Sequence, residues 1–224
     1  MKKHIPNTIT CLNLFSGCIA VLFALDGAYL YMFYCVIASG VFDFFDGMLA
    51  RALHVKSTIG KELDSLADMV SFGFLPGAVF FMLLQSATPS PYIPYLGFVV
   101  TVFSALRLAK FNVDERQTHD FIGLNTPMNT FLVVSLPFIA ADTSFSFTLA
   151  TLLPLIAVLS YLLVSEIRLF SMKLSSLAWQ DNKFKYIFLL LAASLLIVLK
   201  FSAFPFILIA YISFSSLHFA QKKA

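Results

Sequence analysis

Long apolar runs, separated by short polar or Pro/Gly-containing stretches, cover almost the whole sequence. A transmembrane helix needs about 20 predominantly apolar residues, because the hydrocarbon core of a bilayer is about 30 Å thick. The sequence therefore predicts an all-α integral membrane protein with about eight transmembrane helices. We expect these helices near residues 11–25, 28–52, 60–86, 92–110, 127–141, 146–168, 184–199 and 203–219, with the first, fifth and seventh of them short.

Composition excludes most soluble functions. Hydrophobic residues make up 59% of the chain and charged residues only 12%, whereas about a quarter of the residues in a soluble domain are charged. The predicted helices leave no room for a soluble domain, so we expect residues 1–224 to form a single polytopic membrane domain. The net charge of +3 is spread along the chain and offers no basic face to a nucleic acid.

The basic residues indicate how the chain is oriented. Cytoplasmic loops of membrane proteins carry an excess of lysine and arginine. If the eight helices alternate in direction, all 15 basic residues except Lys200 fall on one side of the membrane. We therefore expect a multi-pass protein of the inner (cytoplasmic) membrane with both termini in the cytoplasm. This asymmetry alone would suit a transporter, a channel or a lipid enzyme equally well.

Four aspartates lie at the predicted cytoplasmic ends of the second and third helices, namely Asp43, Asp46, Asp64 and Asp68. At about 100° per residue, the first two share one helix face and the last two share another. The segment 53–59 is short enough to join two antiparallel helices whose acidic faces meet. Converging carboxylates would repel one another, and Mg²⁺ or Mn²⁺ would remove that penalty, because these ions suit carboxylates shared with substrate phosphates.

Small and basic residues flank the four aspartates. Gly47 and Gly60 would let a backbone or a ligand approach closely. Arg51 could hold an anionic phosphate, or it could extend to the membrane interface. The alternative without a ligand is an interfacial ion-pair cluster of the aspartates with Arg51, Lys56 and Lys61. We prefer the ligand site, because ionisable residues within a membrane typically have a function.

The block from residue 43 to residue 68 resembles the signature of the CDP-alcohol phosphotransferase family. Its two parts are Asp43-Phe44-Phe45-Asp46-Gly47-Met48-Leu49-Ala50-Arg51 and Gly60-Lys61-Glu62-Leu63-Asp64-Ser65-Leu66-Ala67-Asp68, which fill every fixed position of the signature. Members of that family are integral membrane enzymes in which an alcohol attacks a CDP-linked phosphoryl group and releases CMP. The resemblance implies a six-helix core, followed here by two C-terminal helices, and it suggests a homodimer.

Further segments resemble the bacterial and archaeal phosphatidylserine synthases of this family. They are residues 5–10, 13–17, 71–76, 107–112 and 165–173. The resemblance implies that L-serine attacks CDP-diacylglycerol among the membrane lipids and yields phosphatidylserine and CMP. Two departures, Lys110 in place of arginine and Asn125 in place of proline, bear on the acceptor. An acceptor of the glycerol 3-phosphate, inositol or choline type therefore stays open.

The resemblance also implies roles for residues that bind metal and nucleotide. Two divalent ions, Mg²⁺ or Mn²⁺, would be held chiefly by the four aspartates, and Asp68 would also be the general base that deprotonates serine. Gly47 would make room for the nucleotide, and Arg51 with Gly60 would complete the surroundings of the diphosphate. Asn7 and Thr10 would hydrogen-bond the CDP moiety; alternatively, they cap the first helix, where such residues are favoured.

The acceptor needs a partner for its carboxylate, and an arginine can bind a carboxylate with two parallel hydrogen bonds. The basic candidates are Arg107, Lys110, Arg168 and Lys173, and the neutral candidates are Asn112 and Ser165. Each basic residue could instead anchor the protein to anionic lipid headgroups. We favour Arg107 and Arg168 as acceptor contacts and regard Lys173 as an anchor.

Two further classes of function compete with this hypothesis. A membrane prenyltransferase also uses aspartate-rich helices and Mg²⁺, but it has two acidic motifs far apart, whereas the second half of this chain offers only Asp142, Glu166 and Asp181. A cation channel or transporter would need acidic residues through the depth of the bilayer or an inverted repeat. The sequence has neither pattern.

Overall fold

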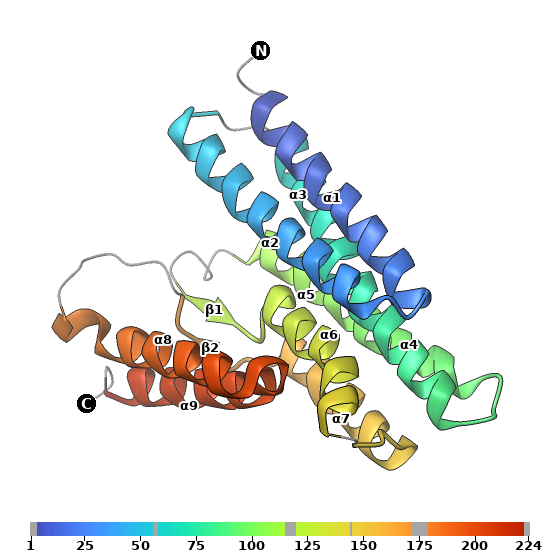
Figure 1. The fold of residues 1–224 in the computed structure, drawn as a ribbon. Coiled ribbons are helices and arrows are strands. Elements are labelled where there is room, and N and C mark those ends of the chain that lie inside the picture. Colours follow the sequence, from blue (N-terminus) through green and yellow to red (C-terminus); the bar gives the residue numbers. More distant parts are fainter. Residues whose placement is uncertain (1–3, 56–57, 115–119, 144, 172–178, 222–224) are drawn as a thin grey trace.

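A computed structural model describes residues 4–55, 58–114, 120–143, 145–171 and 179–221 of the protein (Figure 1). Almost all of these residues are helical. In chain order the helices are α1 (His4–Leu25), α2 (Tyr29–Ala52), α3 (Thr58–Asp68), the π-helix η1 (Met69–Phe74), α4 (Leu75–Ala87), the 3₁₀-helix η2 (Ile93–Phe98), α5 (Val99–Val113), α6 (Thr126–Thr143), α7 (Leu149–Val164), α8 (Trp179–Leu199), the 3₁₀-helix η3 (Lys200–Ser202) and α9 (Ala203–Gln221).

Each of the eight predicted segments is helical, but several bounds differ from the prediction. The first helix begins at His4 rather than near residue 11. Its polar first turn is accommodated because Thr8 donates its hydroxyl to the carbonyl of His4, one turn earlier in the same helix. The fifth and seventh helices are also longer than predicted, with 18 residues in α6 and 21 in α8.

The chain is an all-α, multi-pass membrane protein. Within the described part, five helical stretches are long and apolar enough to cross a membrane, namely His4–Leu25, Tyr29–Ala52, Thr58–Ala87, Ile93–Val113 and Asn182–Gln221. The last stretch contains both α8 and α9. Helices α6, of 18 residues, and α7, of 16, complete the predicted set of eight. Many large apolar side chains are exposed on the outer surface, as contact with lipid requires.

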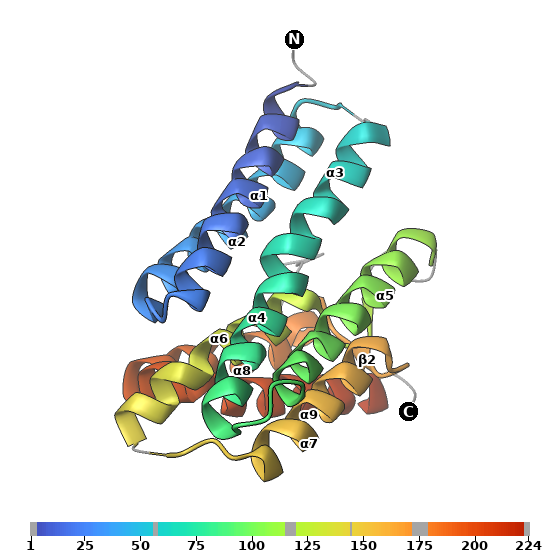
Figure 2. The same ribbon diagram turned by 90° about the vertical axis from the view of Figure 1, so that its right-hand side faces the viewer.

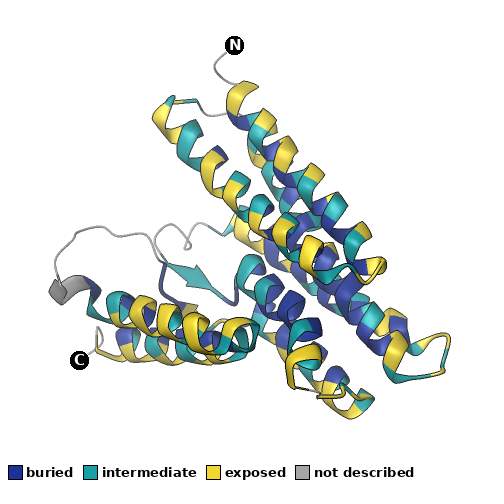
Figure 3. Ribbon diagram, viewed as in Figure 1, coloured by how far each residue is buried: buried dark blue, intermediate teal, exposed yellow. Residues whose placement is uncertain are grey.

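The helices form two groups that share α4 as their link (Figures 1 and 2). Helix α1 packs along α2, α3 and η1, and α4 continues the line of α3 into the second group. There α4 contacts α5, α6 and α7, while α8 pairs with α9. Buried residues concentrate where η1 and α4 meet α6, as Figure 3 shows, and the largest of them include Phe72, Phe80 and Leu84.

A two-stranded ribbon, which the sequence did not predict, joins two of the connections between helices. Strand β1 (Phe121–Ile122) pairs antiparallel with β2 (Arg168–Leu169). One strand belongs to the connection between α5 and α6 and the other to the connection between α7 and α8. The pairing gives hydrogen-bond partners to backbone N–H and C=O groups that are shielded from water. Gly123 continues the ribbon with φ at +77°, and a Cβ there would lie 2.7 Å from the carbonyl oxygen of Leu163. Only glycine fits this position.

The π-helix η1 follows Asp68 directly and connects three neighbouring helices. Its carbonyls at Phe72 and Gly73 accept hydrogen bonds from Thr130 of α6 at 2.8 Å and from Thr101 of α5 at 3.0 Å. On the side of α1, a Cβ at Gly17 would lie 2.9 Å from the Cα of Ser71, so the two backbones touch here. Such π turns are rare and occur often at functional sites.

Candidate active site

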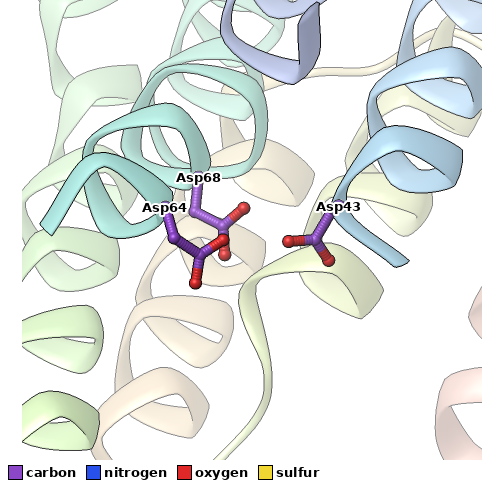
Figure 4. A group of neighbouring side chains, drawn as sticks. All are labelled: Asp43, Asp64 and Asp68. Atoms are coloured by element: carbon purple, nitrogen blue, oxygen red, sulfur yellow. The ribbon is translucent and has the colours of Figure 1, made fainter. Parts of the chain in front are cut away.

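Three carboxylates from two helices converge at one point. Asp43 extends from α2, and Asp64 and Asp68 extend from α3, one turn apart (Figure 4). All three side chains are half-buried, and one oxygen of each lies within 4.8 Å of the others. The short connection between α2 and α3 therefore brings the two acidic faces together, as the spacing predicts. Figure 4 shows Asp43 facing the other two across the gap between the helices.

Asp46, the fourth predicted ligand, is not part of this group of three. It is buried and accepts a hydrogen bond of 2.6 Å from the hydroxyl of Thr10 on α1. It lines the same cavity as Asp64, however. The four aspartates thus border one region, with Asp46 held toward α1 and the other three facing one another.

The surroundings of the three carboxylates fit a hard divalent cation. Asp64 Oδ1 is buried and has no hydrogen-bond partner among the described residues. Lys61 donates its ammonium to the carbonyl of Asn112 at 2.9 Å, and Arg51 is exposed beside a different pocket. The described basic residues therefore do not form the alternative ion-pair cluster, and Lys56 lies outside the described residues. A cation with oxygen ligands would supply the missing partner and offset the repulsion.

A cavity of about 550 Å³ opens beside the carboxylates between α1, α2 and α3. It contains four of the five residues predicted to bind CDP or its diphosphate. The lining residues are Pro6, Asn7, Thr10, Asp46, Gly47, Ala50, Val55, Thr58, Gly60, Lys61 and Asp64. Asn7 and Thr10 lie inside α1, so the alternative that they cap this helix is wrong. A Cβ added at Gly47 would meet no atom within 4 Å, which leaves its face open to the cavity.

Arg51 does not line this cavity. It lies with Ala50, His54 and Val55 around an adjoining pocket of about 590 Å³. Ala50 and Val55 border both spaces. The predicted contact between Arg51 and a diphosphate therefore lies at the margin of the cavity rather than inside it.

Asn13 is a site residue to which the sequence reasoning assigned no role. It is fully buried in α1, and its Nδ2 donates to Asp68 Oδ1 at 3.3 Å. Its carbonyl accepts hydrogen bonds from the hydroxyls of Ser39 on α2 and Ser71 in η1. Asn13 thereby fixes α1 against the helices that carry the aspartates. An asparagine within an apolar run was the available signal, because a buried amide needs partners.

The predicted acceptor residues separate into two sets. Arg107 and Ser165 line a small pocket of about 200 Å³ together with Lys110. Asn112 instead donates its side-chain amide to Ser65 on α3 at 2.8 Å. Arg168 is exposed on β2 and lines another pocket, next to Phe219. Lys173 lies outside the described residues.

Arg107 is the central group of the small pocket. Its guanidinium is buried, donates from Nε to the carbonyl of Leu124 at 3.3 Å, and lies 4.8 Å from the centroid of the Phe111 ring. Its helix α5 is joined to α3, one of the two acidic helices, by the hydrogen bond from the Asn112 side chain to Ser65. The small pocket and the three carboxylates are therefore neighbouring parts of one site.

Comparison with known proteins shows the family to which this chain belongs. A model of the CDP-alcohol phosphatidyltransferase family matches residues 3–179. A CDP-diacylglycerol–serine O-phosphatidyltransferase of Bacillus subtilis is 34% identical over 177 residues, which are 74% of this chain and 89% of the relative. A protein of that name from Helicobacter pylori is 30% identical, over 73% of this chain and 70% of the relative. Another from Saccharomyces cerevisiae is 36% identical over 60% and 54% of the two chains. The chain thus belongs to the CDP-alcohol phosphatidyltransferase family.

Proposed function

We propose that this protein transfers the phosphatidyl group of CDP-diacylglycerol to the hydroxyl of L-serine and so forms phosphatidylserine and CMP. The names of the relatives from Bacillus subtilis and Helicobacter pylori support the substrates. The observation that carries the reaction class is the convergence of Asp43, Asp64 and Asp68 beside a cavity lined by the family signature. A diphosphate in this cavity would lie against the carboxylates, as a metal-assisted phosphoryl transfer requires.

We assign two divalent ions, Mg²⁺ or Mn²⁺, to the acidic group. Asp43, Asp64 and Asp68 would hold them, and Asp46 would complete the ligand set from its place on the cavity wall. When bound, such ions neutralise charge on the diphosphate and on the departing CMP. The unpartnered Asp64 Oδ1 supports this assignment.

The chain's own residues bind and orient the substrates and deprotonate the serine hydroxyl. Asn7, Thr10, Gly47 and Gly60 hold the CDP moiety in the cavity that they line, and Arg51 contacts the anionic diphosphate at its margin. Asp68 accepts the proton of the serine hydroxyl while the new bond from serine oxygen to phosphorus forms and the bond from phosphorus to the CMP oxygen breaks. Positioning supplies most of the rate, and proton removal adds about 10²- to 10⁴-fold.

The acceptor binds in the small pocket of Arg107 and Ser165. The guanidinium of Arg107 pairs with the serine carboxylate. The hydrogen bond between α5 and α3 supports an acceptor position near Asp68. Lys110, which also lines this pocket, adds a second positive charge. Asn112 and Arg168 lie outside this pocket. Asn112 holds α5 to α3 through its hydrogen bond to Ser65, and Arg168 belongs to strand β2 of the ribbon.

The setting of the reaction follows from the lipid substrate. We place the protein in the cytoplasmic membrane as a single domain of residues 1–224, with both termini and the site facing the cytoplasm. The acyl chains of the substrate then lie among apolar helices and the nucleotide meets the basic side. We also propose a homodimer, which the family resemblance supports.

Release of CMP tests the proposed function. Purified enzyme receives CDP-diacylglycerol with Mn²⁺ or Mg²⁺ and, in separate reactions, serine, glycerol 3-phosphate, inositol or no acceptor. Of these four reactions, we expect only the one that contains serine to release CMP rapidly. Lipid analysis of that reaction should find phosphatidylserine. Release only with glycerol 3-phosphate or inositol would refute the serine assignment.

A matched pair of aspartate variants tests the metal assignment in the same assay. Asp64→Asn should abolish CMP release, because it removes a charged ligand from the group of three. Asp26→Asn alters an exposed aspartate between α1 and α2 and should leave the rate unchanged. Full activity of Asp64→Asn would refute the metal site.

A further inference from the structure

The C-terminal helix α9 holds the backbone of one residue, Phe170, from both sides. The hydroxyl of Tyr211 donates to the Phe170 carbonyl at 2.8 Å, and the Phe170 amide donates to the hydroxyl of Ser215 at 3.3 Å. The Phe170 ring is fully buried against Phe188 of α8 and against Tyr211 and His218 of α9. We call Phe170, Tyr211 and Ser215 the Phe170 anchor.

The ribbon connects the Phe170 anchor to the wall of the acceptor pocket. Leu169, the neighbour of Phe170, pairs with Phe121 of β1. The next residue of β1, Ile122, lines the pocket. Two residues further on, the carbonyl of Leu124 accepts the hydrogen bond of the Arg107 guanidinium. A displacement of Phe170 would therefore be transmitted through two paired strands to the group that faces the acceptor.

Arg107 also lies against the ribbon itself. Its guanidinium lies over the rings of Phe111 at 4.8 Å and of Phe121 at 5.9 Å, measured to their centroids, so the ribbon supports it directly. The position of Arg107 thus depends on the ribbon, and through Leu169 and Phe170 it depends on α9.

The Phe170 anchor lies partly beyond the segment that matches the family model. That match ends at residue 179, the first residue of α8, so all of α9 follows it. We infer that Tyr211 is a positioning residue for the acceptor, an inference that rests on the proposed function. Tyr211 fixes Arg107 through Phe170 and the ribbon. It thereby sets the affinity for serine but not the affinity for CDP-diacylglycerol. The nucleotide cavity is lined by residues of α1, α2, α3 and the loop between α2 and α3. None of these residues takes part in the contacts that lead from Tyr211 through Phe170 and the ribbon to Arg107.

Removal of one hydroxyl tests this inference. Tyr211→Phe keeps the buried ring against Phe170 and removes only the hydrogen bond to its carbonyl. We expect the KM for serine to rise about tenfold, a change that corresponds to about 1.4 kcal/mol. We expect the KM for CDP-diacylglycerol and kcat to stay within about twofold of the wild-type values, because an interaction that serves only acceptor binding affects KM alone.

The control lies on the same helix. Ser213→Ala removes an exposed hydroxyl that bonds only to the Ile209 carbonyl of α9 itself, and it should change neither KM. Ser215→Ala is the second test variant and should raise the KM for serine in the same direction as Tyr211→Phe. If the unfolding temperature in detergent shows that Tyr211→Phe does not fold, Ser215→Ala takes its place as the test of the inference.

Each outcome has one meaning. A raised KM for serine with an unchanged KM for CDP-diacylglycerol supports the inference. An unchanged KM for serine in a folded variant, or an equal rise of both KM values, overturns it and indicates a merely structural role for α9. A wild-type enzyme that uses another acceptor, or none, refutes the proposed function instead, so the two failures are distinguishable.

Discussion

Replacement of Gly47 by alanine should impair substrate binding without harming the fold. A methyl group at this position of α2 would meet no atom within 4 Å and would point into the cavity of about 550 Å³. Alanine in place of glycine stabilises a helix interior by about 0.5–1 kcal/mol. In the occupied cavity, however, the methyl group competes with the nucleotide. Overpacking of this kind costs about 1–3 kcal/mol, which corresponds to a rise of about 5- to 150-fold in the KM for CDP-diacylglycerol.

The assay compares Gly47→Ala with Gly40→Ala in the same helix. A Cβ at Gly40 would lie at an ordinary contact distance of 3.8 Å from the Phe131 ring, away from the cavity. Both variants should unfold at or above the wild-type temperature, and only Gly47→Ala should show the raised KM. A wild-type KM in Gly47→Ala would refute the placement of the nucleotide against this glycine. Unfolding of Gly47→Ala would contradict the open space around it.

Three further predictions concern the helix contacts and the metal. Gly17→Ala should lower the free energy of unfolding by about 1–3 kcal/mol, since its Cβ would lie 2.9 Å from the Cα of Ser71; denaturation in detergent measures this, and an unchanged stability would show that α1 can move freely. Asn13→Leu removes the donor to Asp68 and should reduce CMP release about 10- to 100-fold while raising the Mn²⁺ concentration for half-maximal rate; a normal metal dependence would count against this. A chelator should abolish CMP release, and Mg²⁺ or Mn²⁺ should restore it and raise the unfolding temperature; activity that persists in the chelator would exclude the metal.

The acidic group could be predicted because its geometry is local. Asp43 on one helix and Asp64 with Asp68 on the next are separated by a short connection, so helical periodicity alone brings their faces together. The division of the four aspartates could not be predicted in this way. Asp46 accepts a hydrogen bond from Thr10, which lies far away in the sequence. No spacing rule within α2 distinguishes Asp46 from Asp43.

The acceptor side was harder to predict because it depends on long-range contacts. Arg107 on α5 and Ser165 at the end of α7 come together because these two helices, far apart in the sequence, pack against each other. The ribbon that adds Ile122 to the same pocket consists of two-residue strands, which have no sequence period. Arg168, which looked equivalent to Arg107 as a basic residue, lies on the exposed side of that ribbon. Asn125, a departure from the subgroup, caps α6 by accepting a hydrogen bond from the Met128 amide at 2.9 Å. Asn13 is a neutral residue within an apolar run, so its spacing does not distinguish it from a helix-packing residue.

The π-helix at Met69–Phe74 makes the length of this segment as important as its composition. The carbonyls of Phe72 and Gly73 are bonded to α6 and α5, so the end of the segment beyond Asp68 is fixed. Deletion or insertion of one residue here would turn everything before it by about 100° relative to everything after it. Asp64 and Asp68 would then face away from Asp43. Substitutions in this stretch can be tolerated wherever the side chain has room, but a change in the number of residues would disassemble the acidic group.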